Sequence, residues 1–149
     1  MAATIARSGD RDDGPMTELP QASPRQSFYV AVGGEPTFRR IVARFYLEVA
    51  ADEEILRPLY PEEDLGPAQE RLTLFLMQYW GGPTTYSDER GHPRLRMRHH
   101  PFVIGPAARD AWLRAMRVAL DDAAVPEPYR TELWHYLETV AHNMTNSDA

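Results

Sequence analysis

The chain has 149 residues, a formal net charge of −6 and no cysteine. This length favours one domain, and the acidic balance argues against nucleic acid as a partner, because a nucleic-acid binder needs a basic face. The lack of cysteine excludes disulfides, thiolate nucleophiles and cysteine-bound zinc or iron–sulfur centres.

The first part of the chain predicts no folded structure. Residues 1–26 are polar, contain several prolines and show no periodicity, so we expect a disordered N-terminal extension. They lack the apolar stretch of a signal peptide or a membrane anchor, and we therefore expect a cytoplasmic protein. The folded domain is expected over 27–145, with a short tail over 146–149.

The folded part is predicted to be all-α. The apolar run 27–32 predicts one or two helical turns, which Gly33 and Gly34 end. Segment 52–59 predicts a short turn or helix, and the composition of 84–90 is typical of a loop. No alternating strand pattern, internal repeat or nucleotide-binding glycine loop is present. Four segments repeat apolar residues at three- and four-residue steps and predict amphipathic helices, over 36–50, 64–80, 106–125 and 128–144.

The stretch 91–102 predicts a metal ligand rather than a structural helix. Pro93 suits a first helical turn and Pro101 ends the helix, which leaves about two turns. His99 lies in the last of them, on the same face as Leu95. We interpret His99 as the axial ligand of a haem iron. The alternative, common for a lone histidine, is a partly buried side chain that bonds a backbone carbonyl.

Several short motifs, in their order and spacing, resemble the group II truncated haemoglobins over residues 27–144. Each motif alone is weak, and their combination is specific. They are Phe45-Tyr46, Tyr60-Pro61, Phe75-Leu76, Tyr79-Trp80-Gly81-Gly82-Pro83, Gly91-His92-Pro93, Arg98-His99, Pro101-Phe102 and Ala111-Trp112-Leu113. The resemblance implies a truncated globin fold, a two-over-two helical sandwich that encloses haem b, the iron complex of protoporphyrin IX. His99 would be its proximal iron ligand.

The same resemblance implies a set of haem contacts. Arg94 and Arg98, four residues apart, would pair with the haem propionates, although a solvated basic face explains them equally well. The apolar members of the set would belong to the core of any helical protein. The residues implied are His99, Arg98, Arg94, Leu72, Phe75, Leu76, Leu95, Phe102 and Tyr86.

On the opposite face of the haem, the family's ligand-contacting positions correspond to Tyr46, Tyr60, Ala68, Leu72 and Trp112. Ala68 stands where many globins keep a histidine, so hydrogen bonds to the gas must come from the two tyrosines and the tryptophan. Bound dioxygen carries partial negative charge, and each donor would slow its release about tenfold. We therefore expect high affinity and slow release. Without the resemblance, Tyr46 and Trp112 would be ordinary core aromatics.

Three functional hypotheses follow. The favoured one is a haem protein that binds dioxygen, NO and CO, as a monomer or a homodimer. The second is a haem enzyme, either an NO dioxygenase or a peroxidase that acts on hydrogen peroxide. It would need an external reductase, because the chain has no flavin site. The third is a haem-free helical interaction module, which requires that His99 binds no iron.

Overall fold

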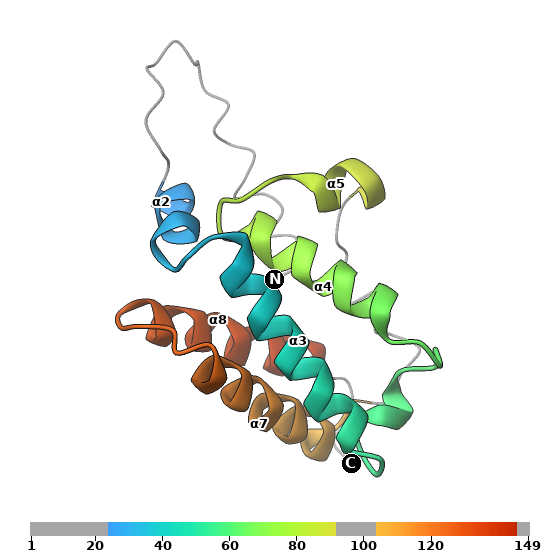
Figure 1. The fold of residues 1–149 in the computed structure, drawn as a ribbon. Helices are drawn as coiled ribbons and strands as arrows, with labels where there is room; N and C mark the ends of the chain where they lie inside the picture. Colours follow the sequence, from blue (N-terminus) through green and yellow to red (C-terminus); the bar gives the residue numbers. More distant parts are fainter. Residues whose placement is uncertain (1–23, 92–103, 146–149) are drawn as a thin grey trace.

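The computed structural model describes residues 24–91 and 104–145, and all regular structure within these ranges is helical (Figure 1). The predicted all-α class is therefore confirmed. The elements are α2 (Pro24–Ala31), α3 (Glu35–Ala51), the 3-10 helix η2 (Arg57–Leu59), α4 (Gly66–Tyr79), α5 (Thr85–Arg90), α7 (Pro106–Asp122) and α8 (Tyr129–Met144).

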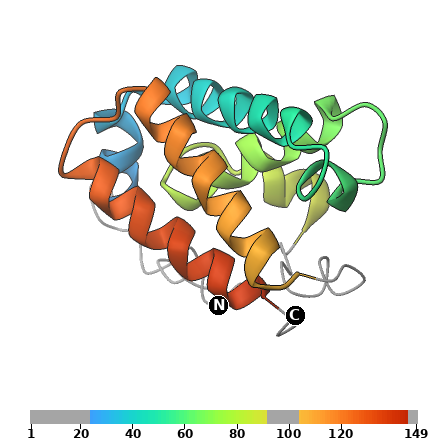
Figure 2. The same ribbon diagram turned by 90° about the horizontal axis from the view of Figure 1, so that it is seen from below.

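The four long helices form two packed pairs. Helix α3 lies between α4 and α7 and packs against both, as Figure 1 shows. Helix α7 also packs along α8, which lies beside it in Figure 2. The arrangement is the two-over-two helical sandwich that the resemblance implied, with α3 and α4 in one pair and α7 and α8 in the other.

Helix α3 contributes the centre of the hydrophobic core. Phe38, Val42, Phe45 and Val49 are fully buried and follow one another at three- or four-residue steps. This spacing places all four on one stripe of the helix, and a stripe of this kind must be covered by other apolar elements. Met116 of α7, also fully buried, belongs to the same cluster. The core therefore lies where α3 and α7 cross.

One helix starts earlier than the sequence predicted, and one short helix was not predicted at all. Helix α2 begins at Pro24, inside the stretch predicted to be an extension. Residues 84–90 were predicted to form a loop, and this prediction was wrong, because α5 occupies Thr85–Arg90. Contacts with α4 explain the helix. Tyr86 is buried edge-to-face against Phe75, with ring centroids 5.5 Å apart, and the amide of Gln78 hydrogen-bonds the backbone N–H and the hydroxyl of Ser87.

The N-cap position of α4 is Leu65, and Asp64 just before it bonds the first N–H of the helix. The carboxylate of Asp64 accepts a hydrogen bond of 2.9 Å from the backbone N–H of Gly66, the first residue of the helix. An acceptor at this position satisfies one of the N–H groups that a helix leaves unpaired at its N-terminus.

In the described part of the chain, no helix combines the length and the apolar character that crossing a bilayer requires.

Candidate functional site

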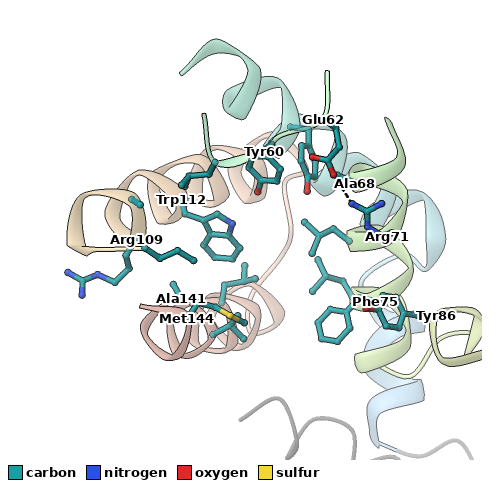
Figure 3. Close-up of a pocket in the computed structure, with 18 of the residues that line it drawn as sticks. Tyr60, Glu62, Ala68, Arg71, Phe75, Tyr86, Arg109, Trp112, Ala141 and Met144 are labelled. Carbon is teal, nitrogen blue, oxygen red and sulfur yellow. Dashed lines mark hydrogen bonds and ion pairs between the residues drawn. The ribbon is translucent and has the colours of Figure 1, made fainter. Parts of the chain in front are cut away.

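A cavity of about 480 Å³ lies between α4 on one side and α7 and α8 on the other (Figure 3). We call it the central cavity. Most of its wall is apolar, and one group of polar side chains lies near the loop that joins η2 to α4. The lining residues are Tyr46, Leu59, Tyr60, Pro61, Glu62, Ala68, Arg71, Leu72, Phe75, Leu76, Tyr86, Arg90, Ile104, Ala108, Arg109, Trp112, Tyr136, Leu137, Val140, Ala141 and Met144.

Three aromatic side chains that carry polar hydrogens meet at one wall of the central cavity. Tyr46 comes from α3, Tyr60 from the loop after η2, and Trp112 from α7. The rings of Tyr46 and Tyr60 meet edge to face, with centroids 5.6 Å apart. Phe45, one residue before Tyr46, lies edge to face with Trp112 at 5.5 Å. These contacts hold the three polar groups against one wall.

The hydroxyl of Tyr60 is the centre of this hydrogen-bonded group. Tyr46 and Trp112 both hydrogen-bond to it. The indole N–H can only donate, so Trp112 is the donor toward Tyr60. Tyr46 shares its hydrogen bond with another hydroxyl, and either of the two tyrosines can donate in it. The oxygen of Tyr60 thus accepts from Trp112 and lies beside the Tyr46 hydroxyl, so the polar hydrogens of all three side chains gather at one wall of the cavity.

Burial keeps both tyrosines protonated. Removal from water is the largest influence on each, and it raises the pKa of Tyr46 and of Tyr60 above the ordinary value of 10.0. The carboxylate of Glu62 raises both values further. At neutral pH both hydroxyls therefore carry the proton that a hydrogen-bond donor needs.

Helix α4 forms an apolar wall of the central cavity. Ala68, Leu72, Phe75 and Leu76 lie along one face of the helix and line the cavity, and Ala68 and Phe75 are each only 6% exposed. Tyr86 of α5 also lines the cavity, and its ring packs edge to face against Phe75. Every residue of the described ranges that the sequence predicted for the site therefore lines this one cavity. Their roles toward haem and gas stay predictions.

The other predicted site residues fall in the stretch 92–103, outside the described residues. The structure gives no position for them, and their roles remain predictions from the sequence. They are His99, Arg98, Arg94, Leu95 and Phe102.

The wall formed by α8 was missed as part of the site. Tyr136, Leu137, Val140, Ala141 and Met144 all line the central cavity. The sequence did show these residues as an apolar stripe, and the stripe was assigned to the core. A stripe that packs on other side chains and a stripe that faces a cavity have the same periodicity, so the pattern alone could not separate the two cases.

Charged side chains also line the cavity, and sequence reasoning missed these too. Arg71 of α4 forms an ion pair with Glu62 at 3.2 Å, which Figure 3 shows beside Ala68. Arg109 pairs with its neighbour Asp110 at 3.1 Å. The guanidinium carbon of Arg90 lies 5.9 Å from the centre of the Tyr86 ring, and Arg90 forms no ion pair with any described residue. The cavity therefore combines apolar walls with cations at its edge.

Comparison with known proteins agrees with this geometry. A model of the family described as bacterial-like globin matches residues 27–146. The group 2 truncated hemoglobin YjbI of Bacillus subtilis is 40% identical over 124 residues, which cover 81% of this chain and 92% of that protein.

Solved structures are similar along nearly their whole length. A thermostable hemoglobin from the actinobacterium Thermobifida fusca is 62% identical, with a TM-score of 0.79, and the match covers 82% of this chain and 98% of that one. A truncated oxygen-avid haemoglobin from Bacillus subtilis is 39% identical, with a TM-score of 0.74, over 80% of this chain and 98% of that one. The present chain therefore belongs to the bacterial-like globins and is a group II truncated haemoglobin, a haem protein that binds gaseous ligands.

Proposed function

We propose that the central cavity holds haem b, that His99 is its axial iron ligand, and that the protein binds dioxygen, NO and CO with high affinity and slow release. The observation that carries the proposal is the hydroxyl of Tyr60. It lines the central cavity, is hydrogen-bonded with Tyr46 and Trp112, and so brings the polar hydrogens of three side chains to one wall.

The cavity suits a flat, largely apolar group with two carboxylates. Its volume lies within the range of about 300–1,000 Å³ that is usual for small-molecule and cofactor sites. The faces of α4 and α8 supply apolar walls for a macrocycle, and Arg90 supplies a cation at the edge that no described carboxylate neutralises. Arg94 and Arg98 are predicted to add to this positive charge.

When bound, haem supplies an iron atom on which a diatomic gas can bind. The protein's own contribution is to place a donor beside that gas. Tyr60 would donate from a fixed position, because its ring packs on Tyr46 and its hydroxyl is hydrogen-bonded with Tyr46 and Trp112, and a donor that needs no reorientation stabilises partial negative charge efficiently. Each good bond of this kind slows ligand release about tenfold. Tight binding of this kind suits sensing or redox chemistry better than delivery.

The absorption spectrum of the purified protein tests the proposal. We expect a strong Soret band after hemin is added, and we expect His99→Ala to lose it. His135→Ala is the matched control, because this histidine is exposed on α8 and does not line the central cavity. A protein that refuses hemin, or a His99→Ala variant with an unchanged spectrum, would contradict the proposal.

A further inference from the structure

The guanidinium of Arg57 donates three hydrogen bonds to the loop that carries Tyr60. One nitrogen of its guanidinium donates to the backbone carbonyl of Tyr60 at 2.8 Å. The other donates to the carbonyls of Glu62 at 2.7 Å and Glu63 at 3.1 Å. The backbone N–H of Tyr60 returns a bond of 3.1 Å to the carbonyl of Arg57. Arg57 thus holds Tyr60 through both of its peptide groups.

These bonds matter because the loop has no helical hydrogen bonds of its own. Residues 60–65 lie between η2 and α4 and belong to neither. Backbone carbonyls that are turned toward the protein need donors, and here one side chain supplies them to three carbonyls of the loop. Without these donors the loop could settle in other conformations, and the Tyr60 hydroxyl would move with it.

Arg57 is itself fixed to the end of α3, the helix that carries Tyr46. Its backbone N–H donates to the carbonyl of Asp52 at 2.9 Å, and the carboxylate of Asp52 accepts a bond of 3.0 Å from the N–H of Ile55. A continuous set of hydrogen bonds therefore leads from the C-terminal end of α3 through Arg57 to Tyr60. The relative placement of Tyr46 and Tyr60 depends on it.

A second anchor joins the loop to α4, through the ion pair of Glu62 with Arg71. Both side chains of this pair are 38% exposed, and ion pairs as exposed as this one contribute little. The Arg57 bonds go to backbone atoms of the loop and come from a charged donor, so they are the stronger constraint.

We propose that Arg57 is a positioning residue that sets how long a gas ligand stays in the central cavity, by holding Tyr60 where its hydroxyl reaches that ligand. The proposal rests on the proposed function, in which Tyr60 is the donor. It also explains why an arginine occupies this position. The guanidinium presents its donors in a rigid, planar fork that can reach several carbonyls at once, which the single ammonium of a lysine cannot reproduce.

The test is a double-mutant cycle on the full chain loaded with haem, read as the rate of oxygen dissociation. We expect Arg57→Gln to accelerate release about tenfold, the effect of losing one hydrogen bond to the ligand. The rate of oxygen dissociation from Arg57→Lys should fall between the rates of the parent protein and of Arg57→Gln. In a Tyr60→Phe background, Arg57→Gln should change the rate by less than about twofold, because the group through which it acts has gone.

Two further measurements separate positioning from a general loss of structure. The stretching frequency of bound CO reports the donor at the ligand, and it should shift in Arg57→Gln as it does in Tyr60→Phe. The matched control is Arg40→Gln, which removes an exposed arginine of α3 that pairs with Asp122 of α7 and does not line the central cavity. This control should leave both the rate and the frequency unchanged. If Arg57→Gln fails to bind hemin, the same double-mutant cycle is measured with Arg57→Lys in its place.

Other outcomes are equally decisive. If Tyr60→Phe accelerates release while both Arg57 variants do not, the inference fails and the proposed function stands. Equal acceleration by Arg57→Gln in both backgrounds would also overturn it, because Arg57 would then act independently of Tyr60. If Tyr60→Phe itself leaves the rate unchanged, the proposed role of Tyr60 fails first.

Discussion

The rings of Tyr46 and Tyr60 meet edge to face, with centroids 5.6 Å apart and planes inclined by 75°. One ring comes from α3 and the other from the loop after η2. The contact matters because it is accompanied by a hydrogen bond between the two hydroxyls. Tyr60 is also hydrogen-bonded with Trp112, so it joins the other two side chains, and this distinction makes Tyr46 and Tyr60 unequal in the network.

Removing the Tyr60 hydroxyl should have the largest effect on ligand release. We expect Tyr60→Phe to accelerate oxygen dissociation by about tenfold or more, because a charge-assisted hydrogen bond to the ligand is lost. Stopped-flow displacement of oxygen by CO measures this rate. Tyr129→Phe is the matched control, since Tyr129 packs on Phe28 and does not line the cavity. Equal rates in Tyr60→Phe and the parent protein would refute the assignment of the donor.

Tyr46 and Trp112 should act mainly through Tyr60. Each is hydrogen-bonded with Tyr60, so Tyr46→Phe and Trp112→Phe should each accelerate release less than Tyr60→Phe does. Combining either with Tyr60→Phe should add much less than the product of the single effects, because residues in one hydrogen-bond network are coupled. The same displacement experiment on the double variants measures the coupling. Strictly multiplicative effects would show that the three residues contact the ligand independently.

Alkaline pH should destabilise the fold through the buried tyrosines. Burial raises the pKa of Tyr46 and of Tyr60 above the ordinary value of 10.0, whereas in the unfolded chain both ionise near that value. Above about pH 10 the unfolded state therefore binds fewer protons than the native state, and stability falls as pH rises. Above about pH 10, each tyrosine lowers the free energy of unfolding by up to about 1.4 kcal/mol per pH unit. Well below pH 10 neither tyrosine makes it depend on pH.

Urea unfolding at a series of pH values checks this dependence. The free energy of unfolding of Tyr46→Phe should fall less steeply above about pH 10 than that of the parent protein. Tyr129→Phe, which removes a tyrosine from outside the cavity, should leave the slope as it is. An unchanged slope in Tyr46→Phe would mean that this hydroxyl is not buried in solution.

A methyl group at Gly82 should destabilise the turn that follows α4. A Cβ at this position would lie 2.6 Å from the ring of Tyr29 and 2.9 Å from the carbonyl oxygen of Met77. The Tyr29 ring cannot move away freely, because it stacks on the buried ring of Phe38 at 5.7 Å. We expect Gly82→Ala to lower the free energy of unfolding by about 1–3 kcal/mol, the usual cost of overpacking.

Urea denaturation at neutral pH measures this cost. Gly66→Ala is the matched control, because a Cβ there meets only the side chain of Asp64, at 3.1 Å, and Gly66 lies at the exposed start of α4. This control should be close to neutral. If both glycine variants were equally stable, the close approach of Tyr29 to Gly82 would not exist in solution.

Local periodicity was enough to predict the long helices, and the family resemblance supplied the residues of α4 that line the cavity. The predicted helix over 36–50 is α3, and the residues predicted on α4, from Ala68 to Leu76, share one face. The short helix α5 could not be predicted in the same way. Its six residues form no stable helix alone, and burial of Tyr86 against Phe75 together with the Gln78 bonds stabilises it.

The sequence by itself determined where the long helices lie and which of their faces are apolar, because both follow from residues within one or two turns of each other. Only the tertiary structure decided that Tyr60 meets Tyr46 and Trp112, that Arg57 holds its loop, and that the stripe of α8 lines a cavity in addition to the packed core. These relations join distant parts of the chain, and they depend on how the helices pack, which no local pattern encodes.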